Sequence, residues 1–267
     1  MRRLTAHIAD FGGGVEQALA DLGRLSSLAF SAAERIALGP LRGRPLRLHA
    51  IIAQVRRAGN ESLPLVALIA FLVGMILALQ SAHQLQQLGA VNLVADLVAV
   101  SVVRGLAPLL TAILVAGRVG SAVAAELGTM KVSEEIDALK VMGFDPVSYL
   151  VVPRLLGLLI AVPCLTLFAD IVGILGGAAV GHGVLGLSLS GYLRDSLHAL
   201  SLEDFLGGFL KAVTFGGIIG LVGCHRGLET RGGAQAVGTA TTAAVVRSIV
   251  LIIVADLVVT AFLFLRG

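Results

Sequence analysis

The sequence has few charged residues and few aromatic ones. Lysine, arginine, aspartate and glutamate make up 14% of its 267 residues, and aromatic residues make up 4%, with no tryptophan. A soluble domain carries about 25% charged residues, and a disordered chain is poor in apolar residues. Because 57% of this chain is hydrophobic, both classes are excluded. The composition therefore indicates an integral membrane protein.

Cysteine is also scarce. Cys164 and Cys224 are the only two, and each lies within an apolar run. Such an environment disfavours a disulfide, so we expect two free, buried thiols. The net charge of +3 comes from basic residues beside apolar runs. Because such residues orient a membrane protein, we expect no nucleic-acid partner.

The first fifty residues are predicted to form an interfacial region. Residues 11–38 have apolar positions at helical spacing with charges between them, and a basic turn follows at 42–47. This pattern favours an amphipathic helix on the cytoplasmic membrane surface, and the alternative is a small soluble helical hairpin. Acidic residues interrupt the apolar positions, so we expect no cleavable signal peptide.

Five segments are long and apolar enough to cross a membrane. They are residues 63–79, 93–115, 155–180, 205–224 and 243–265. We therefore predict an all-α integral membrane protein, with an N-terminal interfacial helix in residues 1–50 and a five-span domain in residues 51–267. Most Lys and Arg residues precede the first span or lie between spans two and three and between four and five. This distribution places the N-terminus in the cytoplasm.

Glycines recur at four-residue spacing in two of these spans. They occupy positions 173, 177 and 181 in the third span and positions 216 and 220 in the fourth. Small residues at this spacing allow membrane helices to approach closely, so we assign these glycines to helix packing.

The loop predicted between spans two and three contains a short helix at 134–142. Ser133 is expected to cap its N-terminus, and Gly143 to end it. Such a helix either rests on the bilayer or docks into a soluble partner, and composition leaves both interpretations open. Its candidate contact residues are Ser133, Glu134, Glu135, Ile136, Asp137, Leu139 and Met142.

Two sequence blocks resemble the signature of the MlaE/YrbE family of permease subunits. The first includes AGRVGSA at 116–122 and AELGTM at 125–130, and the second is GLETRGGA at 227–234. The similarity covers about residues 50–267. The signature-loop residues are Gly117, Arg118, Gly120, Ser121, Glu126 and Gly128. The chain departs from the family at 104–108, where RGLAP replaces the frequent RELGP and an acidic residue is missing.

The resemblance implies the homodimeric permease subunit of an ABC-type transporter in the bacterial inner (cytoplasmic) membrane. Such a transporter moves phospholipids or related lipids between that membrane and an MCE-domain lipid-binding protein, for cell-envelope lipid homeostasis. The resemblance also implies a separate ABC ATPase that uses ATP and Mg, and in several members a STAS-domain protein. The chain itself is then not an enzyme and needs no cofactor. The resemblance assigns the helix at 134–142 as the contact to the ATPase.

Charged residues inside the predicted spans are a second group of candidates. They are Lys211, Asp256, Asp170 and Arg104. A charge at the bilayer centre costs about 2.5–3.5 kcal/mol, so such residues pair or face a cavity. Lys211 and Asp256 are the expected pair, either as a polar lining near the lipid path or as a structural salt bridge. A lipid cavity is expected between spans one, two and five, with Leu72, Met75, Leu79 and Leu97 on its wall.

Two other functions fit parts of the sequence. An ion-coupled secondary transporter would use the intramembrane charges, and a membrane scaffold would only anchor a complex. The sequence has no P-loop, so ATP hydrolysis is expected on another chain. Its six histidines are scattered without metal-ligand spacing, so we expect no metal site.

Overall fold

The computed structural model describes residues 2–39 and 47–266, and side chains within 20–39 and 47–265. Most of the predicted basic turn at 42–47 therefore lies outside the described residues. Within these ranges the chain is 90% helical and has no strand. The predicted all-α class is confirmed.

Five helical segments of the described chain are long and apolar enough to cross a membrane, as predicted. They are α2 (Leu48–Gln87), the composite segments Val91–Val132 and Val147–Gly183, α9 (Leu202–Leu228) and α10 (Ala234–Arg266). Each contains one predicted span and extends beyond it. A helix of 40 residues, the length of α2, is about 60 Å long, roughly twice the hydrocarbon thickness of a bilayer. The bundle therefore continues outside the membrane.

The second segment is one helical rod with irregular turns. In order it comprises η2 (Val91–Leu93), α3 (Val94–Ser101), η3 (Val102–Leu106), α4 (Ala107–Val115), η4 (Ala116–Gly120) and α5 (Ser121–Val132). η3 and η4 are π-helical turns. The prediction that residues 116–130 form a loop is therefore wrong. The glycines of this stretch lie in helical turns, and some serve close packing against another helix instead of ending the rod.

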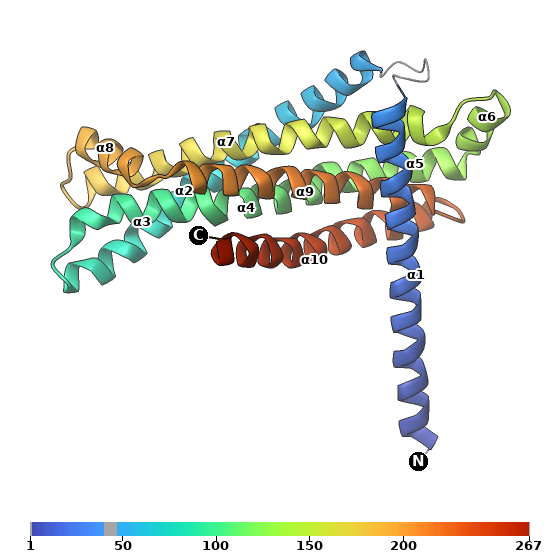
Figure 1. Cartoon of the computed structure of the whole chain (residues 1–267), viewed down its shortest axis with the longest axis horizontal. Coiled ribbons are helices and arrows are strands. Elements are labelled where there is room, and N and C mark those ends of the chain that lie inside the picture. The colour runs from blue at the N-terminus through green and yellow to red at the C-terminus, as the bar shows by residue number, and fades with distance from the viewer. Residues whose placement is uncertain (1, 40–46, 267) are drawn as a thin grey trace.

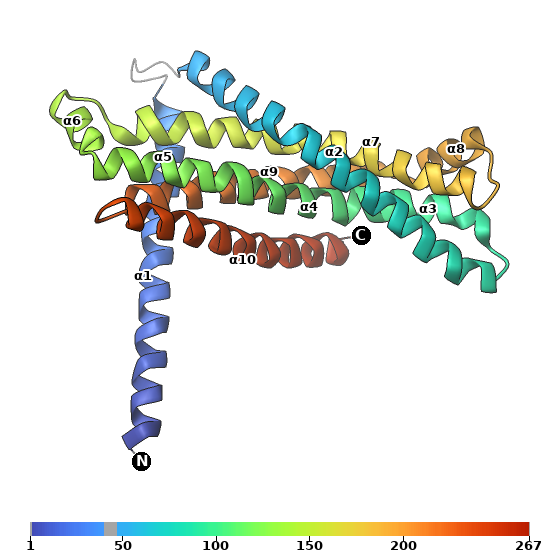
Figure 2. The ribbon, with the colours of Figure 1, turned by 180° about the vertical axis from the view of Figure 1, so that it is seen from behind.

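The central helix of the bundle is α7 (Val152–Gly183), which follows the π-helical turn η5 (Val147–Val151). It packs most extensively against α2 and also contacts α9 and α4 (Figures 1 and 2). Glycine makes these contacts possible. A Cβ at Gly74 of α2 would lie 1.9 Å from the carbonyl oxygen of Gly173, and one at Gly216 would lie 2.7 Å from that of Leu158. The assignment of the glycines to packing is confirmed at these positions.

Two helices lie beside the spans. α1 (Arg2–Leu38) is longer than the predicted 11–38, and in Figures 1 and 2 it runs across the long axis of the bundle. If the bundle axis crosses the membrane, α1 lies along the membrane plane, as the interfacial prediction requires. α8 (Leu189–Ala199) was not predicted. Its Tyr192 ring is buried against α7, where a Cβ at Gly177 or Gly181 would approach it to 2.4 Å and 2.7 Å.

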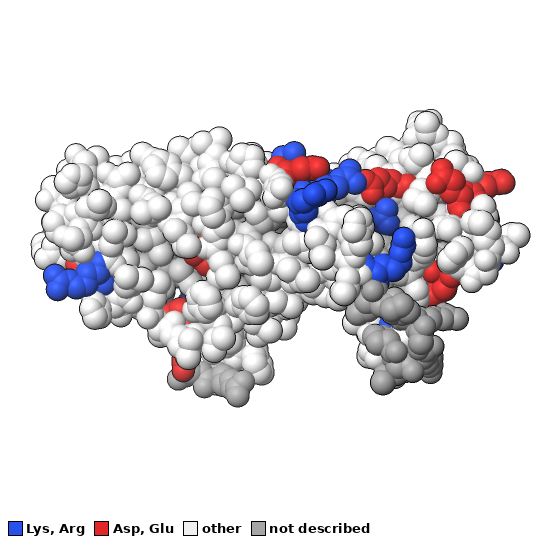
Figure 3. Space-filling model, turned by 90° about the horizontal axis from the view of Figure 1, so that it is seen from above, with Lys and Arg blue, Asp and Glu red and all other residues white. Residues whose placement is uncertain are grey.

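Charged side chains are unevenly distributed over the surface. In the view of Figure 3, acidic and basic groups gather over the end of the bundle where α5 and α6 lie in Figure 1. Most of the remaining length is uncharged, with a small basic group at the opposite end. The uncharged stretch is suited to lipid contact, and the charged end to water and polar partners.

Candidate functional site

The short helix between the second and third spans is α6 (Glu135–Val141), one residue shorter at each end than predicted. Glu134 precedes it in a left-handed conformation with φ of 60°. The prediction that Ser133 caps this helix is wrong. Ser133 instead ends α5, and its hydroxyl donates to the carbonyl of Thr129 at 2.9 Å. Gly143 ends the segment with φ of 81°, as predicted. The two left-handed residues turn α6 back toward the bundle (Figure 1).

One face of α6 fixes it to the bundle. Ile136 is 2% exposed and belongs to a hydrophobic cluster with Ala32 of α1, Val123 and Leu127 of α5 and Val151 of η5. Leu139 packs against the same cluster. Because three elements other than α6 contribute to this cluster, a force on α6 is passed to all of them.

The opposite side of α6 ends in an exposed apolar tip. Val141 is 90% exposed, Met142 62% and Phe144 50%. Met142 therefore does not continue the buried face of Ile136 and Leu139, as predicted, but belongs to this tip. Apolar groups so exposed at the charged end of the molecule are typical of a surface that meets a partner.

Ion pairs surround the tip. Asp137 accepts from Lys131 and Lys140, each at 2.8 Å. Hydrogen bonds from Lys131, and then from Lys140, lower the pKa of the Asp137 carboxyl to about 2. Asp145 pairs with Arg35 of α1 and accepts from the Ser148 hydroxyl at 2.7 Å. Burial would raise the pKa of the Asp145 carboxyl, but these partners outweigh it and hold the pKa at about 2.

Signature residue Glu126 ties three helices together. Its carboxylate pairs with Arg57 of α2 and, at 3.2 Å, with Arg154 of α7. Closer to the membrane centre, in η4, the Arg118 guanidinium lies 3.9 Å from Glu61 of α2. The charged members of the first signature block therefore join α2 and α7 to the rod that carries α6.

The two signature blocks, about a hundred residues apart in sequence, pack against each other. A Cβ at Gly128 would lie 3.0 Å from the Thr230 hydroxyl, and one at Gly227 would lie 2.5 Å from Cβ of Leu127. Gly120 contacts Ile219 of α9 in the same way. Gly117 meets no neighbour within 4 Å, and Ser121 donates to its carbonyl at 2.6 Å. The signature thus makes α5 and α9 one close-packed pair immediately before α6.

The structure brings Lys211 and Asp256 together, as predicted. Lys211 Nζ lies 2.9 Å from Oδ1 of Asp256, and the side chains are 3% and 24% exposed. The same ammonium donates to the carbonyl of Arg104 in π-helical turn η3 at 3.1 Å. The Arg104 side chain lies 3.6 Å from Asp204. One ammonium group therefore links α9, α10 and the irregular turn of the second span.

Asp170 differs from the other intramembrane charges. It is 8% exposed on α7, and no ion pair involving it occurs among the described side chains. The expectation that such residues pair is not met at this position. Because an ionised carboxylate without a partner is costly in a low-dielectric setting, burial favours the neutral acid at Asp170.

The residues expected to line a lipid cavity lie on the outer surface of the single chain. Leu72, Leu79 and Leu97 are 46–47% exposed, and Met75 is partly buried against the α2–α3 core. Leu79 borders a hollow of about 510 Å³. Cys224 is buried, whereas Cys164 is exposed on the apolar surface of α7, and both are free. The expected burial of Cys164 within the protein is therefore wrong.

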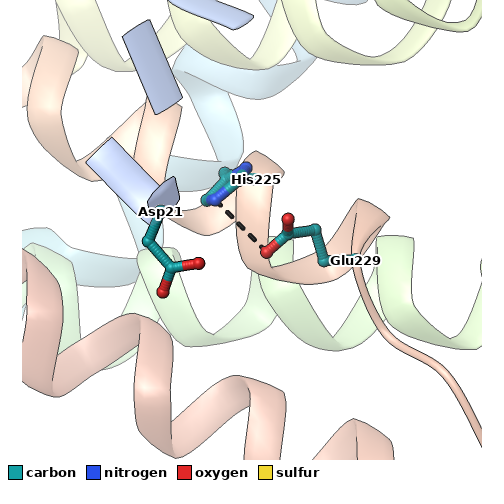
Figure 4. A group of neighbouring side chains, drawn as sticks. All are labelled: Asp21, His225 and Glu229. Carbon is teal, nitrogen blue, oxygen red and sulfur yellow. Dashed lines mark ion pairs between the residues drawn. The ribbon is translucent and has the colours of Figure 1, made fainter. Parts of the chain in front are cut away.

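A cluster that the sequence did not reveal joins α1 to α9 and α10. Figure 4 shows Asp21, His225 and Glu229 converging, with ligand atoms within 4.8 Å of one another. These residue types bind metals. Their carboxylates, however, already pair with the guanidinium groups of Arg24, Arg226 and Arg247. Three guanidinium groups repel a metal cation, so the geometry favours an ion-pair network. We call these six residues the Asp21 network.

The charge of this network favours ionised Asp21. Burial would raise the pKa of its carboxyl, but the hydrogen bond from Arg24 and the charge of Arg247 outweigh it, and the pKa is lowered. Asp21 and Arg226 are 205 positions apart in sequence. No local pattern therefore marks them, and only the placement of α1 across the bundle brings them together.

Comparison with known proteins gives the same family throughout. The family model for the MlaE permease matches residues 51–262. A protein of Rickettsia typhi named "Probable ABC transporter permease protein" is 42% identical over 86% of this chain and 88% of its own length. A Synechocystis protein with the same type of name is 36% identical over 88% and 89%. The chloroplastic protein TRIGALACTOSYLDIACYLGLYCEROL 1 of Arabidopsis thaliana is 41% identical over 80% of this chain and 61% of its own length.

Proposed function

The chain belongs to the MlaE permease family of ABC transporters, and on that premise we propose that it is the membrane subunit of an ATP-driven lipid transporter. A permease is not an enzyme, and an ABC permease implies an ATPase partner. We propose that this ATPase is a separate subunit that binds ATP and Mg. The α6 tip is the observation that carries the proposal, because it offers apolar groups on a base fixed to several helices.

The proposed substrate is a phospholipid or a related lipid. The outward surface of α10 is apolar and exposed, with Val250 at 54%, Leu257 at 70% and Phe262 at 55%. Such walls suit acyl chains, which require few specific contacts. The name of the Arabidopsis relative contains trigalactosyldiacylglycerol, which is a glycerolipid. We propose that two copies of the chain enclose a lipid cavity bordered by α2, α3 and α10.

The remaining parts of the proposal concern location and partners. The charged α6 end suits the cytoplasmic side of the bacterial inner membrane, with α1 on its surface and the N-terminus in the cytoplasm. An MCE-domain lipid-binding protein would then meet the α8 end, and a STAS-domain protein would bind the ATPase. Charge asymmetry between the two ends supports this orientation.

The packing suggests how motion would pass from the ATPase to the lipid. Displacement of α6 moves α5 through the cluster around Ile136. The signature glycines pass that motion to α9. At the far end of α9, Lys211 holds both α10 and the carbonyl of Arg104. The two walls of the proposed cavity therefore move together with α6.

Substitution at the α6 tip tests the proposed coupling. Val141→Asp places a charge on a 90% exposed side chain, so the fold should be retained. We expect the variant to lose co-purification with the ATPase and lipid-dependent ATP hydrolysis. Val184→Asp is the matched control, since Val184 is 67% exposed at the opposite end, and it should behave as wild type. Equal ATPase binding by both variants would contradict the role of α6.

A charge swap tests the intramembrane pair. Lys211→Ala and Asp256→Ala should each impair lipid transport without loss of assembly. The double variant Lys211→Asp with Asp256→Lys re-forms an ion pair between α9 and α10. If the pair is only a structural salt bridge, the swap restores transport in proteoliposomes together with thermal stability. If the pair lines the lipid path, the swap restores stability alone, which is the outcome we expect.

A further inference from the structure

A groove of about 410 Å³ lies between α1, α9 and α10, away from the α6 tip and from Lys211. One part of its lining is apolar, formed by Leu22 and Leu25 of α1, Val222 of α9, and Val250 and Leu251 of α10. Its size falls within the range of small-ligand sites, about 300–1,000 Å³. The groove is therefore large enough for the headgroup and first chain segments of an amphipathic ligand.

The other part of the lining is charged and belongs to the Asp21 network. Asp21, His225, Arg226 and Arg247 all border the groove. Arg226 Nη2 lies 2.7 Å from Asp21 Oδ2, and Arg247 pairs with the same carboxylate oxygen. The Arg247 side chain is 44% exposed, whereas that of Arg226 is 15% exposed. Arg247 therefore retains guanidinium donors that are open to a ligand.

The network has one positive charge in excess. Its three arginines face the carboxylates of Asp21 and Glu229, which leaves +1 when His225 is neutral. Asp21 accepts from Arg24, Arg226 and Arg247 and so cannot neutralise them fully. A phosphodiester carries a single negative charge and accepts charge-assisted hydrogen bonds from arginine. It is the ligand group that balances the network.

The order of polar and apolar groups along the groove matches the order in a lipid leaflet. Arg226 and Arg247 lie nearer the α6 end than Val222 and Val250, because α9 and α10 run in opposite directions there. A lipid in that leaflet has its phosphate toward the α6 end and its chains toward the bundle centre. Basic pockets between membrane helices bind lipid headgroups in this way.

We propose that this groove binds one phospholipid of the leaflet at the α6 end, with its phosphodiester on Arg247 and one acyl chain along Val222 and Val250. The site requires only that the bundle spans a membrane. It is independent of lipid transport, because it lies apart from the proposed cavity between two copies. Its occupant connects α1 to α10 and completes the charge balance of the Asp21 network.

The absence of tryptophan from the chain permits a direct test. In Val250→Trp, the introduced indole is the only one and borders the groove. The full chain is reconstituted in phosphatidylcholine vesicles with rising fractions of brominated phosphatidylglycerol or brominated phosphatidylcholine. Loss of one charge-assisted contact corresponds to about threefold to tenfold in affinity. We expect half-maximal quenching at a correspondingly lower fraction of the anionic lipid.

Three further variants separate a site from general attraction. In the Val250→Trp background, Arg247→Gln should abolish the preference for the anionic lipid, Arg247→Lys should retain part of it, and Arg56→Gln should leave it unchanged. Arg56 is exposed on α2 and outside the network. Leu68→Trp, alone and 57% exposed on α2, should show no preference.

Several results would overturn the proposal. Equal quenching by the two lipids at Val250→Trp would do so, as would a preference that survives Arg247→Gln. A similar preference at Leu68→Trp would mean that the whole surface attracts anionic lipid. Absence of quenching by either lipid would mean that another protein surface covers the groove. Loss of transport without change in this preference would count against the proposed function alone.

Discussion

The two ends of the bundle are held together by different means. At the α6 end, ion pairs connect α1 to the loop before η5, α2 to α5, and α5 to α7. At the α8 end, the buried ring of Tyr192 fills the space beside Gly177 and Gly181. In the described part of the chain, Arg194 and Asp195 of α8 join no ion pair. One end depends on many charges and the other on one ring.

This difference suits a molecule driven from one end. Exposed ion pairs contribute little individually and are screened by salt, but a set of them holds several helices in register. A ring packed against glycines depends on shape, so a small change in volume is costly. We therefore expect the α8 end to be sensitive to single substitutions and the α6 end to be robust.

The largest effect is expected at Tyr192. Tyr192→Ala leaves a cavity between α8 and α7 and should lower the free energy of unfolding by about 3 kcal/mol. Tyr192→Phe is the control. The hydroxyl is buried without a hydrogen-bond partner in the described structure, and burial raises its pKa to about 12, so its removal should cost almost nothing. Unfolding in detergent micelles measures both, and equal losses in the two variants would contradict this account.

A second substitution tests whether shape also governs the middle of the bundle. Gly74→Ala would bring a Cβ to 1.9 Å from the Gly173 carbonyl, so α2 and α7 must separate at a cost of about 2 kcal/mol. In the same helix, Gly59→Ala meets no atom within 4 Å and should stabilise the protein by up to about 1 kcal/mol. Thermal unfolding temperatures should move in opposite directions.

A smaller effect is expected where one ion pair joins α1 to the α6 end. Asp145→Asn should cost about 1 kcal/mol at neutral pH, less than the pKa shift implies, because solvent screens the pair with Arg35. The folded-state pKa, about 2, lies below the ordinary value of 3.8. The carboxyl therefore stabilises the fold above its ordinary pKa and loses this effect as the pH falls toward about 2.

The check is a pH series of unfolding temperatures. The difference between wild type and Asp145→Asn should be constant from neutral pH to just above the ordinary carboxyl pKa and should shrink below it. A difference that grows as the pH falls would show that Asp145 does not stabilise α1 through its charge.

The smallest effect is expected at Asp137. Its carboxylate is solvated beside Lys131 and Lys140, so Asp137→Asn should leave the unfolding temperature unchanged at neutral pH in moderate salt. A clear loss at Asp137, comparable with that at Tyr192, would remove the contrast between the two ends.

The spans and one intramembrane contact could be predicted from sequence. Apolar length alone defines a span, and opposite charges inside two spans have few alternatives to pairing, which locates Lys211 and Asp256. The helical continuation through residues 116–132 could not be predicted in this way. Glycine favours both turns and close helix contacts, and the choice at Gly120 and Gly128 depends on α9, which lies about a hundred residues later.

Other features depend on contacts that leave no local pattern. Ser133 has the side chain of a helix cap, but the left-handed turn at Glu134 directs its hydroxyl to Thr129 instead. α8 has a mixed polarity that is equally typical of a loop, although its tyrosine is matched to glycines of α7. The Asp21 network joins residues more than 200 positions apart. The functions of α6 and of the Lys211–Asp256 pair stay predictions.

The two π-helical turns of the second span, η3 and η4, have a consequence for the direction in which α6 points. A π turn accommodates an extra residue relative to an α-helix, and each residue of an α-helix turns the chain by about 100°. Deleting one residue within Ala116–Gly120 would therefore rotate everything that follows by about that angle. α6 would then face away from α1, although every contact-forming side chain was still present. The orientation of the exposed tip is thus encoded by the number of residues in the span before it.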